Sequence, residues 1–191
     1  RSDRQYENFI LHIEWKHIEP GGNSGVFVWS AARPGEKNRL PDGVEVQMLE
    51  LEWPELHKKD GVTPPIAYVH GELFGVGGVK TIPDNPRGER SKSIENRCLG
   101  RGQWNTYDVI FEGPLFDAEG KVTRKASVTV IHNGVVLHHK QEFNGPSGHQ
   151  NTPKYFKYDG TGPIRLQDHG DPVRFRNMWI REIPEIEGKR P

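Results

Sequence analysis

The chain has 191 residues, and its 26 lysine and arginine residues balance 26 acidic ones, so no bulk charge points to a nucleic acid or an anionic membrane as a partner. Its single cysteine, Cys98, excludes an internal disulfide and a cysteine-rich zinc site. The length predicts one domain over residues 1–191, in which five tryptophans and eight phenylalanines can build a core despite abundant glycine and proline, and no signal peptide or membrane span is visible.

Three strands are predicted in the first fifty residues. Over 9–16, apolar and polar residues alternate, which is typical of a strand with one buried face. A second strand, over 26–29, is apolar on both faces and is expected to be central. Alternation resumes over 43–49, where Glu45 and Gln47 point away from the apolar set. An acid inside a good strand marks either solvent or a functional site.

Residues 50–102 lose this periodicity. They hold five prolines and a glycine cluster at 75–78, which lacks the spacing of a dinucleotide-binding loop. Irregular segments of this length in a compact domain are commonly binding loops. His70 in this segment is a candidate ligand of a metal ion, and so is His149 in a second loop over 145–162.

The next strands are predicted over 104–111 and on either side of Asn133-Gly134. The residue pair Asn-Gly tolerates positive φ and suits a type I′ hairpin between its two β-branched flanks. The stretch 113–125 is predicted to be a polar loop. Surface positions are the simplest expectation for four histidines: His12, His132, His138 and His139.

The run from 164 to 180 predicts two strands joined by a turn at 168–172. Apolar and polar residues alternate in the first strand, and three polar side chains are expected to share the face away from the core: Arg165, Gln167 and His169. The second strand, 173–180, is expected to return as its partner. The spacing of its apolar residues slips near Asn177, which predicts a β-bulge.

These patterns predict an all-β fold. No segment shows helical periodicity over three turns, and short strands separated by turn residues are typical of a sandwich of two antiparallel sheets. We therefore expect a jelly-roll β-sandwich with long loops and little helix.

Six short motifs follow one another along the chain. They are Asn23-Ser24-Gly25-Val26-Phe27, Gly43-Val44-Glu45-Val46-Gln47, His70-Gly71-Glu72-Leu73-Phe74-Gly75, Gln103-Trp104-Asn105, Thr129-Val130-Ile131-His132-Asn133-Gly134-Val135, and Leu166-Gln167-Asp168-His169-Gly170 with Val173-Arg174-Phe175-Arg176-Asn177. In this order they resemble the 3-keto-disaccharide hydrolase domain, long known as a domain of unknown function in secreted glycosyl hydrolases. The resemblance covers about residues 6 to 183.

The resemblance implies a concanavalin-like, laminarinase-like jelly roll that cleaves glycosides already oxidised to the 3-keto sugar. Family members are mostly exported bacterial proteins, so a secreted or periplasmic location is expected. They usually have further strands upstream of the one matching residues 9–16. Those strands are missing here, so we expect either a fragment or a sheet completed by another segment.

A ketone at C3 acidifies the C2 proton, so the glycosidic bond can break by elimination. This chemistry needs a base at C2, a group that stabilises the enolate and an acid for the leaving group. We expect Glu45 and His169 to be the catalytic pair, in an order that the sequence leaves open. The expected substrate-binding residues are Asn23, Gln47, Trp104, Arg165, Gln167 and Arg176.

No cofactor is certain, but a divalent metal ion would also stabilise an enolate. Its candidate ligands are Glu45, His70, His149 and His169. The central expectation is that Glu45, Gln47, Arg165, Gln167, His169 and Arg176 converge on one concave sheet face.

Three alternatives stay open. The first is a classical glycosidase with two catalytic carboxylates. The sequence argues against it, because the strand around Glu45 has one acid where a pair is needed. A non-catalytic carbohydrate-binding module would use a surface formed by Trp29, Trp53, Trp104, Asn23 and Gln47. A homo-oligomer would cover the sheet edge that the missing strands leave open.

Overall fold

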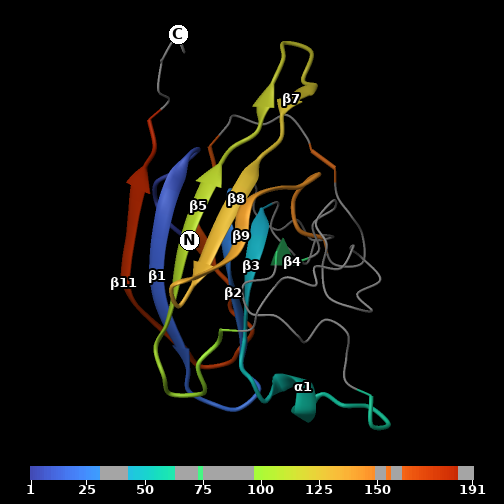
Figure 1. Ribbon diagram of the computed structural model, residues 1–191, viewed down its shortest axis with the longest axis vertical. Coiled ribbons are helices and arrows are strands. Elements are labelled where there is room, and N and C mark those ends of the chain that lie inside the picture. Colours follow the sequence, from blue (N-terminus) through green and yellow to red (C-terminus); the bar gives the residue numbers. More distant parts are fainter. Residues whose placement is uncertain (31–42, 63–72, 75–96, 149–153, 156–160, 185–191) are drawn as a thin grey trace.

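The computed structural model describes residues 1–30, 43–62, 73–74, 97–148, 154–155 and 161–184. These residues form two antiparallel sheets packed face to face, so the all-β sandwich is confirmed (Figure 1). The five-stranded sheet has the order β11 (Val173–Glu182), β1 (Phe9–His17), β5 (Asn105–Glu112), β8 (Ser127–His132) and β9 (Val135–Glu142). The four-stranded sheet has the order β10 (Arg165–Leu166), β2 (Asn23–Val28), β3 (Val44–Leu49) and β4 (Leu73–Phe74).

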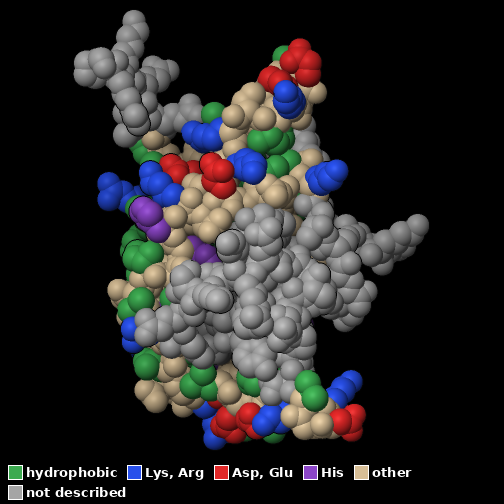
Figure 2. Space-filling view, turned by 45° about the vertical axis from the view of Figure 1, so that its right-hand side comes forward, with side chains coloured by type: hydrophobic (Ala, Val, Ile, Leu, Met, Phe, Trp, Pro, Cys, Tyr) green, Lys and Arg blue, Asp and Glu red, His purple; other side chains and the backbone are tan. Residues whose placement is uncertain are grey.

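Two small elements complete the described fold. The strands β6 (Leu115–Phe116) and β7 (Val122–Arg124) form a hairpin within the predicted polar loop. The helix α1 (Trp53–Leu56) is a single turn with Pro54 in its first positions. Figure 2 shows basic and acidic side chains mixed near the hairpin at one end and near α1 at the other.

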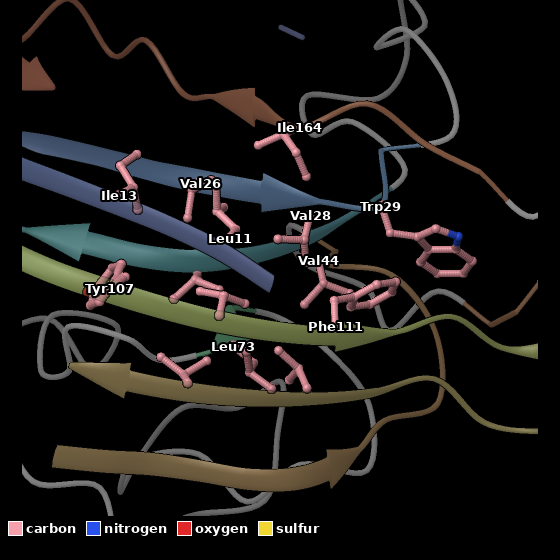
Figure 3. Close-up of a cluster of buried hydrophobic side chains, with 14 of the residues drawn as sticks. Leu11, Ile13, Val26, Val28, Trp29, Val44, Leu73, Tyr107, Phe111 and Ile164 are labelled. Atoms are coloured by element: carbon pink, nitrogen blue, oxygen red, sulfur yellow. The ribbon is translucent and has the colours of Figure 1, made fainter. Parts of the chain in front are cut away.

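The core lies between the two sheets and is built from alternate residues of their long strands. In β1, every second residue from Phe9 to Trp15 is fully buried, as the period of two predicts. Figure 3 shows side chains from both sheets meeting in this layer, among them Leu11, Val26, Val44 and Tyr107. Trp29 belongs to this core with an exposed fraction of 1%, although it ends the second predicted strand.

Two local predictions are confirmed. Asn133 and Gly134 have φ values of 48° and 81°, and a two-residue loop with positive φ at both positions is a type I′ hairpin. In β11, Asn177 and Met178 together face one residue of β1, because the register moves from His12–Trp179 to Glu14–Arg176. This is the expected β-bulge, and Asn177 adopts a φ of 48° there.

The predicted pairing of the two strands in 164–180 is wrong. β10 pairs with β2 in the four-stranded sheet, whereas β11 pairs with β1 in the other sheet. The turn between them therefore crosses from one sheet to the other. Alternation along each strand was right, since Ile164 and Leu166 contact the core, but alternation does not specify the partner strand.

Two of the histidines expected at the surface are buried. His132 is 0% exposed and His138 is 5% exposed. His132 lies in the core, 4.6 Å from the ring of Tyr107 and 6.0 Å from that of Trp15, measured between ring centroids. Burial lowers the pKa of His132 to about 4.

Candidate functional site

The candidate site lies on the face of the four-stranded sheet that points away from the core. Antiparallel registers place Arg165 opposite Phe27, Phe27 opposite Glu45, and Glu45 opposite Phe74. Residues directly opposite each other share a face, so Arg165, Phe27 and Glu45 form one row across β10, β2 and β3. In the next row, Gly25 lies opposite Gln47, and the amide of Gln167 donates to the Gly25 carbonyl at 2.8 Å.

Glu45 is the acid at the centre of the first row. It is 1% exposed, and its amide donates a hydrogen bond of 2.9 Å to the Ser147 hydroxyl. Its carboxylate leans toward Gly25, where the Cβ of any larger residue would lie 2.5 Å from Oε1. Gly25 therefore leaves the space that this carboxylate occupies. The sequence did not single out either Gly25 or Ser147, because an alternating pattern shows no contact between strands.

Gln47 is fixed by the strand that carries it. It is 5% exposed, and its side-chain oxygen accepts a hydrogen bond of 2.9 Å from the amide of Met48. The Tyr107 hydroxyl, from the other sheet, donates to the backbone carbonyl of Gln47 at 2.7 Å. This hydrogen bond connects β3, which carries Gln47, to β5 of the opposite sheet.

The segment after β10 is tied to the edge of β2. The Ser24 hydroxyl donates to the Gln167 carbonyl at 2.9 Å, and the amide of Asn23 donates to the Asp171 carboxylate at 2.9 Å. His169 lies between these two anchors and is exposed. The structure thus holds the His169 turn beside β2, and Asp171 is an anchor that the sequence did not identify.

Two buried acceptors in this region have no hydrogen-bond partner among the described residues. They are the side-chain oxygens of Asn23 and Gln167. An unsatisfied buried acceptor costs free energy, about 1–3 kcal/mol. Hydroxyl or N–H groups of a ligand are the kind of donor that would relieve this cost.

Arg176 and Trp104 do not join these rows, so the expected convergence of all six residues is only partly correct. Arg176 lies on β11 in the opposite sheet, where its Nε donates to Glu14 at 2.6 Å. Its guanidinium lies 3.9 Å from the centre of the Trp104 ring. The Nζ of Lys16 lies 4.7 Å from the same centre. Arg176 and Trp104 therefore belong to a cluster on the five-stranded sheet.

Glu14 holds this cluster together. One carboxylate oxygen accepts from Arg176 and the other accepts from the side-chain amide of Asn177 at 2.9 Å. The hydrogen bond from Asn177 and then that from Arg176 lower the pKa of the Glu14 carboxyl. Since Asn177 is the bulge residue, the cluster fixes the bulge and has a structural role.

The metal-ligand candidates are only partly placed. His70 and His149 lie outside the described residues. Within the described part of the chain, no three histidine, cysteine or acidic side chains are grouped so that they could hold a metal ion. Over the same residues, no helix is both long and apolar enough to cross a membrane.

Comparisons with known proteins agree with this architecture. Residues 1–181 match the model of the 3-keto-alpha-glucoside-1,2-lyase-like domain. No protein among those with curated descriptions matches the chain.

Similar solved structures come from Parabacteroides distasonis, each described as a "putative glycosyl hydrolase". One is 30% identical with a TM-score of 0.63, over 95% of this chain and 66% of that one, so this chain spans just under two thirds of its length. A second is 23% identical with a TM-score of 0.56, over 95% and 81% of the two chains, and shows the fold alone. Because the family model covers nearly the whole sequence, this chain belongs to the 3-keto-alpha-glucoside-1,2-lyase-like domain family.

Proposed function

We propose that this chain is a carbohydrate-active enzyme that cleaves the glycosidic bond of 3-keto-glycosides, including 3-keto-disaccharides. The observation that carries the proposal is the row on the outward face of the four-stranded sheet, where the charged residues Arg165 and Glu45 flank Phe27. Family membership and the 30% identical glycosyl hydrolase support a carbohydrate-active role.

The proposed reaction is an elimination across C1 and C2 of the oxidised sugar. A base removes the C2 proton, which the C3 ketone has made acidic, and an enolate forms. The electron pair then makes the C1–C2 double bond as the C1–O bond to the leaving group breaks, and an acid protonates the leaving oxygen. Addition of water across the double bond would complete a net hydrolysis.

Glu45 and His169 are the proposed proton-transfer pair. Glu45 is buried on β3. His169 is exposed on a turn that a hydrogen bond between Asp171 and Asn23 holds beside β2. These positions would place one group beneath a bound sugar and the other at its rim.

Four further side chains are proposed to hold the sugar. Arg165 supplies a cation for the enolate oxygen, since oriented positive charge stabilises developing negative charge. The buried oxygens of Asn23 and Gln167 would accept hydrogen bonds from sugar hydroxyls, because both are acceptors without a donor among the described residues. Gln47 lies in the same row as Gly25, beside Glu45.

The aromatic surface of a carbohydrate-binding module is not supported. Trp29 is buried in the core, and the Trp104 ring is covered by Arg176 and Lys16. Trp53 stacks on His57 with the ring centres 3.9 Å apart. We therefore propose no binding-only function.

The test is turnover of 3-keto-trehalose and 3-keto-lactose by the wild-type chain, Glu45→Gln and His169→Ala. Loss of an essential acid or base is expected to lower the rate about 10²–10⁴-fold. His139→Ala is the matched control, since His139 is an exposed histidine on β9 and should leave the rate unchanged. Wild-type rates in both site variants would refute the assignment of the pair.

Turnover measured with and without a chelator tests whether a metal ion takes part in the reaction. If turnover is lost on chelation and restored by a divalent cation, Glu45 and His169 are better described as ligands of that cation. If turnover survives, the side chains themselves carry the proton transfers.

A further inference from the structure

The turn that carries His169 runs from one sheet of the sandwich to the other. At its start, the amide of Gln167 donates to a backbone carbonyl of β2 at 2.8 Å. At its end, the carbonyl of Pro172 accepts from the amide of Ile18, which directly follows β1, at 3.1 Å. Residues 168–171 therefore bridge two fixed points that belong to different sheets.

Two hydrogen bonds fix the course of residues 168–171. One is internal, because the amide of Gly170 donates to the carboxylate of Asp168 at 2.8 Å. The other leaves the turn, since the carboxylate of Asp171 accepts from the amide of Asn23 at 2.9 Å. Among the described residues, no other hydrogen bond joins this four-residue span to the rest of the chain. The place of the turn beside β2 therefore depends on Asp171.

The backbone that donates this hydrogen bond is held in place by other contacts. The amide of Gly21 donates to the carboxylate of Glu50 at 2.8 Å, and the amide of Glu50 donates to the carbonyl of Gly22 at 2.8 Å. The buried ring of His17 packs against Gly22, since a Cβ there would lie 2.6 Å from the ring Nδ1. Asn23 itself begins β2 and is paired with β3. This segment is therefore a fixed support for the turn.

The side chain of His169 has no contact of its own that would fix it. It is exposed, and among the described residues it makes no hydrogen bond or ion pair. Its place is therefore set by the backbone of the turn. A group that transfers a proton must come within hydrogen-bond reach of the reacting atom, and a displacement of about 1 Å can lower the rate about 10²-fold.

We propose that Asp171 is a positioning residue for the proposed reaction and that it acts through His169. Its carboxylate joins the turn to the fixed backbone of Asn23, and this bond sets where the His169 side chain stands relative to the row that contains Glu45. Asp171 itself transfers no proton and holds no part of the sugar. The inference rests on the proposed function, in which His169 is one of the two proton-transfer groups.

The chemistry of the turn suits this role. A hydrogen bond from a backbone amide to a carboxylate is charge-assisted and about twice as strong as one between neutral groups. Asp171 also precedes Pro172, and the residue before a proline has a restricted backbone. Gly170, by contrast, has a φ of 83°, a conformation that favours glycine. The hydrogen bond therefore holds the turn at its stiffest residue, two positions from His169.

The anchoring is measured first without substrate, by hydrogen exchange of the Asn23 amide in the whole chain. Asp171→Ala should raise the exchange rate of this amide about tenfold or more, because the amide loses its acceptor. Asp117→Ala is the matched control, since the carboxylate of Asp117 accepts from the amide of Lys121 at 2.7 Å in the turn between β6 and β7. It should leave exchange at Asn23 unchanged. An unchanged exchange rate in Asp171→Ala overturns the proposal.

Turnover of 3-keto-trehalose then tests the positioning, with denaturant unfolding to verify that each variant is folded in the assay. Asp171→Ala should lower kcat about 10²-fold, as expected when a catalytic group moves by about 1 Å. KM should stay within about twofold of the wild type, because Asn23 keeps its other supports. Asp171→Asn retains an oxygen that can accept from the Asn23 amide, so it should recover most of the loss. Asp117→Ala should have the wild-type kcat and KM.

The double variant His169→Ala/Asp171→Ala decides whether Asp171 acts through His169. With His169 removed there is nothing left to position, so the double variant should be no slower than His169→Ala alone. A further loss of about 10²-fold in the double variant overturns the proposal, and so does an equal loss in Asp171→Asn and Asp171→Ala. Slow turnover in His169→Ala with wild-type kcat in Asp171→Ala overturns the positioning role and leaves the proposed function standing. Wild-type turnover in His169→Ala removes the proposed role of His169 and the positioning role with it.

Discussion

At the scale of single residues, the contact between Gly25 and Glu45 makes a sharp prediction. Gly25→Ala would set a methyl group 2.5 Å from the Glu45 carboxylate oxygen, so the carboxylate must move. A displacement of about 1 Å can lower an enzymatic rate about 10²-fold. We expect a loss of this order in turnover of a 3-keto-disaccharide.

The control for this variant is Gly100→Ala, since the nearest atom to a Cβ at Gly100 lies 3.7 Å away. It should leave turnover unchanged. Full activity in Gly25→Ala would show that the position of the Glu45 carboxylate does not matter for the reaction.

A second prediction at this scale concerns the buried histidines. Burial lowers the pKa of His132 from 6.5 to about 4. Burial also lowers the pKa of His17, and the nearby charges of Glu50 and Asp171 act in the opposite direction. The unfolded chain then binds more protons than the folded chain below pH 6.5, so stability is complete above this pH and falls as the pH drops.

For His132 this loss should reach about 3 kcal/mol between pH 6.5 and 4. Denaturant unfolding at several pH values measures it. His132→Phe should flatten the pH dependence of the unfolding free energy, whatever its effect at neutral pH, and His139→Ala on the surface should not. An unchanged slope in His132→Phe would contradict the buried, neutral state of this ring.

At the scale of elements, the β8–β9 hairpin does more than reverse the chain. The side-chain oxygen of Asn133 accepts from the amide of Thr106 at 2.8 Å, and its nitrogen donates to the carbonyl of Arg97 at 2.7 Å. The sequence predicted only a turn here. Hydrogen bonds from a turn to other segments leave no periodic signal, so they could not be predicted.

Asn133→Gly separates the two roles, because glycine keeps the positive φ and removes the side chain. We expect it to lower the unfolding free energy by about 1–2 kcal/mol through the lost hydrogen bonds. Gly134→Ala tests the backbone alone, since Gly134 has a φ of 81° and no atom lies within 4 Å of its Cβ position. Thermal unfolding of both variants measures the effects, and wild-type stability in Asn133→Gly would refute the anchoring role.

The same scale shows how far the candidate site could be predicted. Alternation placed Glu45, Gln47, Arg165 and Gln167 on polar faces, and the registers of β2 with its neighbours bring them to one sheet face. Alternation also gave Arg176 a polar face, but that face belongs to the other sheet. A period of two reports the side of a strand and contains no information about which sheet the strand joins.

At the scale of the whole molecule, the sandwich separates a core layer from two outward faces. One outward face has the Glu45 row, and the other has the Glu14 cluster. The long strands could be predicted because each buries one side against the opposite sheet, as Phe9 to Trp15 do. The short strands β4 and β6, with two residues each, are too short for a period to show.

The central claim is that this chain removes the C2 proton of a 3-keto-glycoside. The most direct measurement compares kcat/KM for a 3-keto-disaccharide with hydrogen or deuterium at C2 of the oxidised ring, alongside the unoxidised disaccharide. We predict a lower kcat/KM for the deuterated substrate and no cleavage of the unoxidised sugar. Cleavage of the unoxidised disaccharide at a comparable rate, without an isotope effect at C2, would contradict the account.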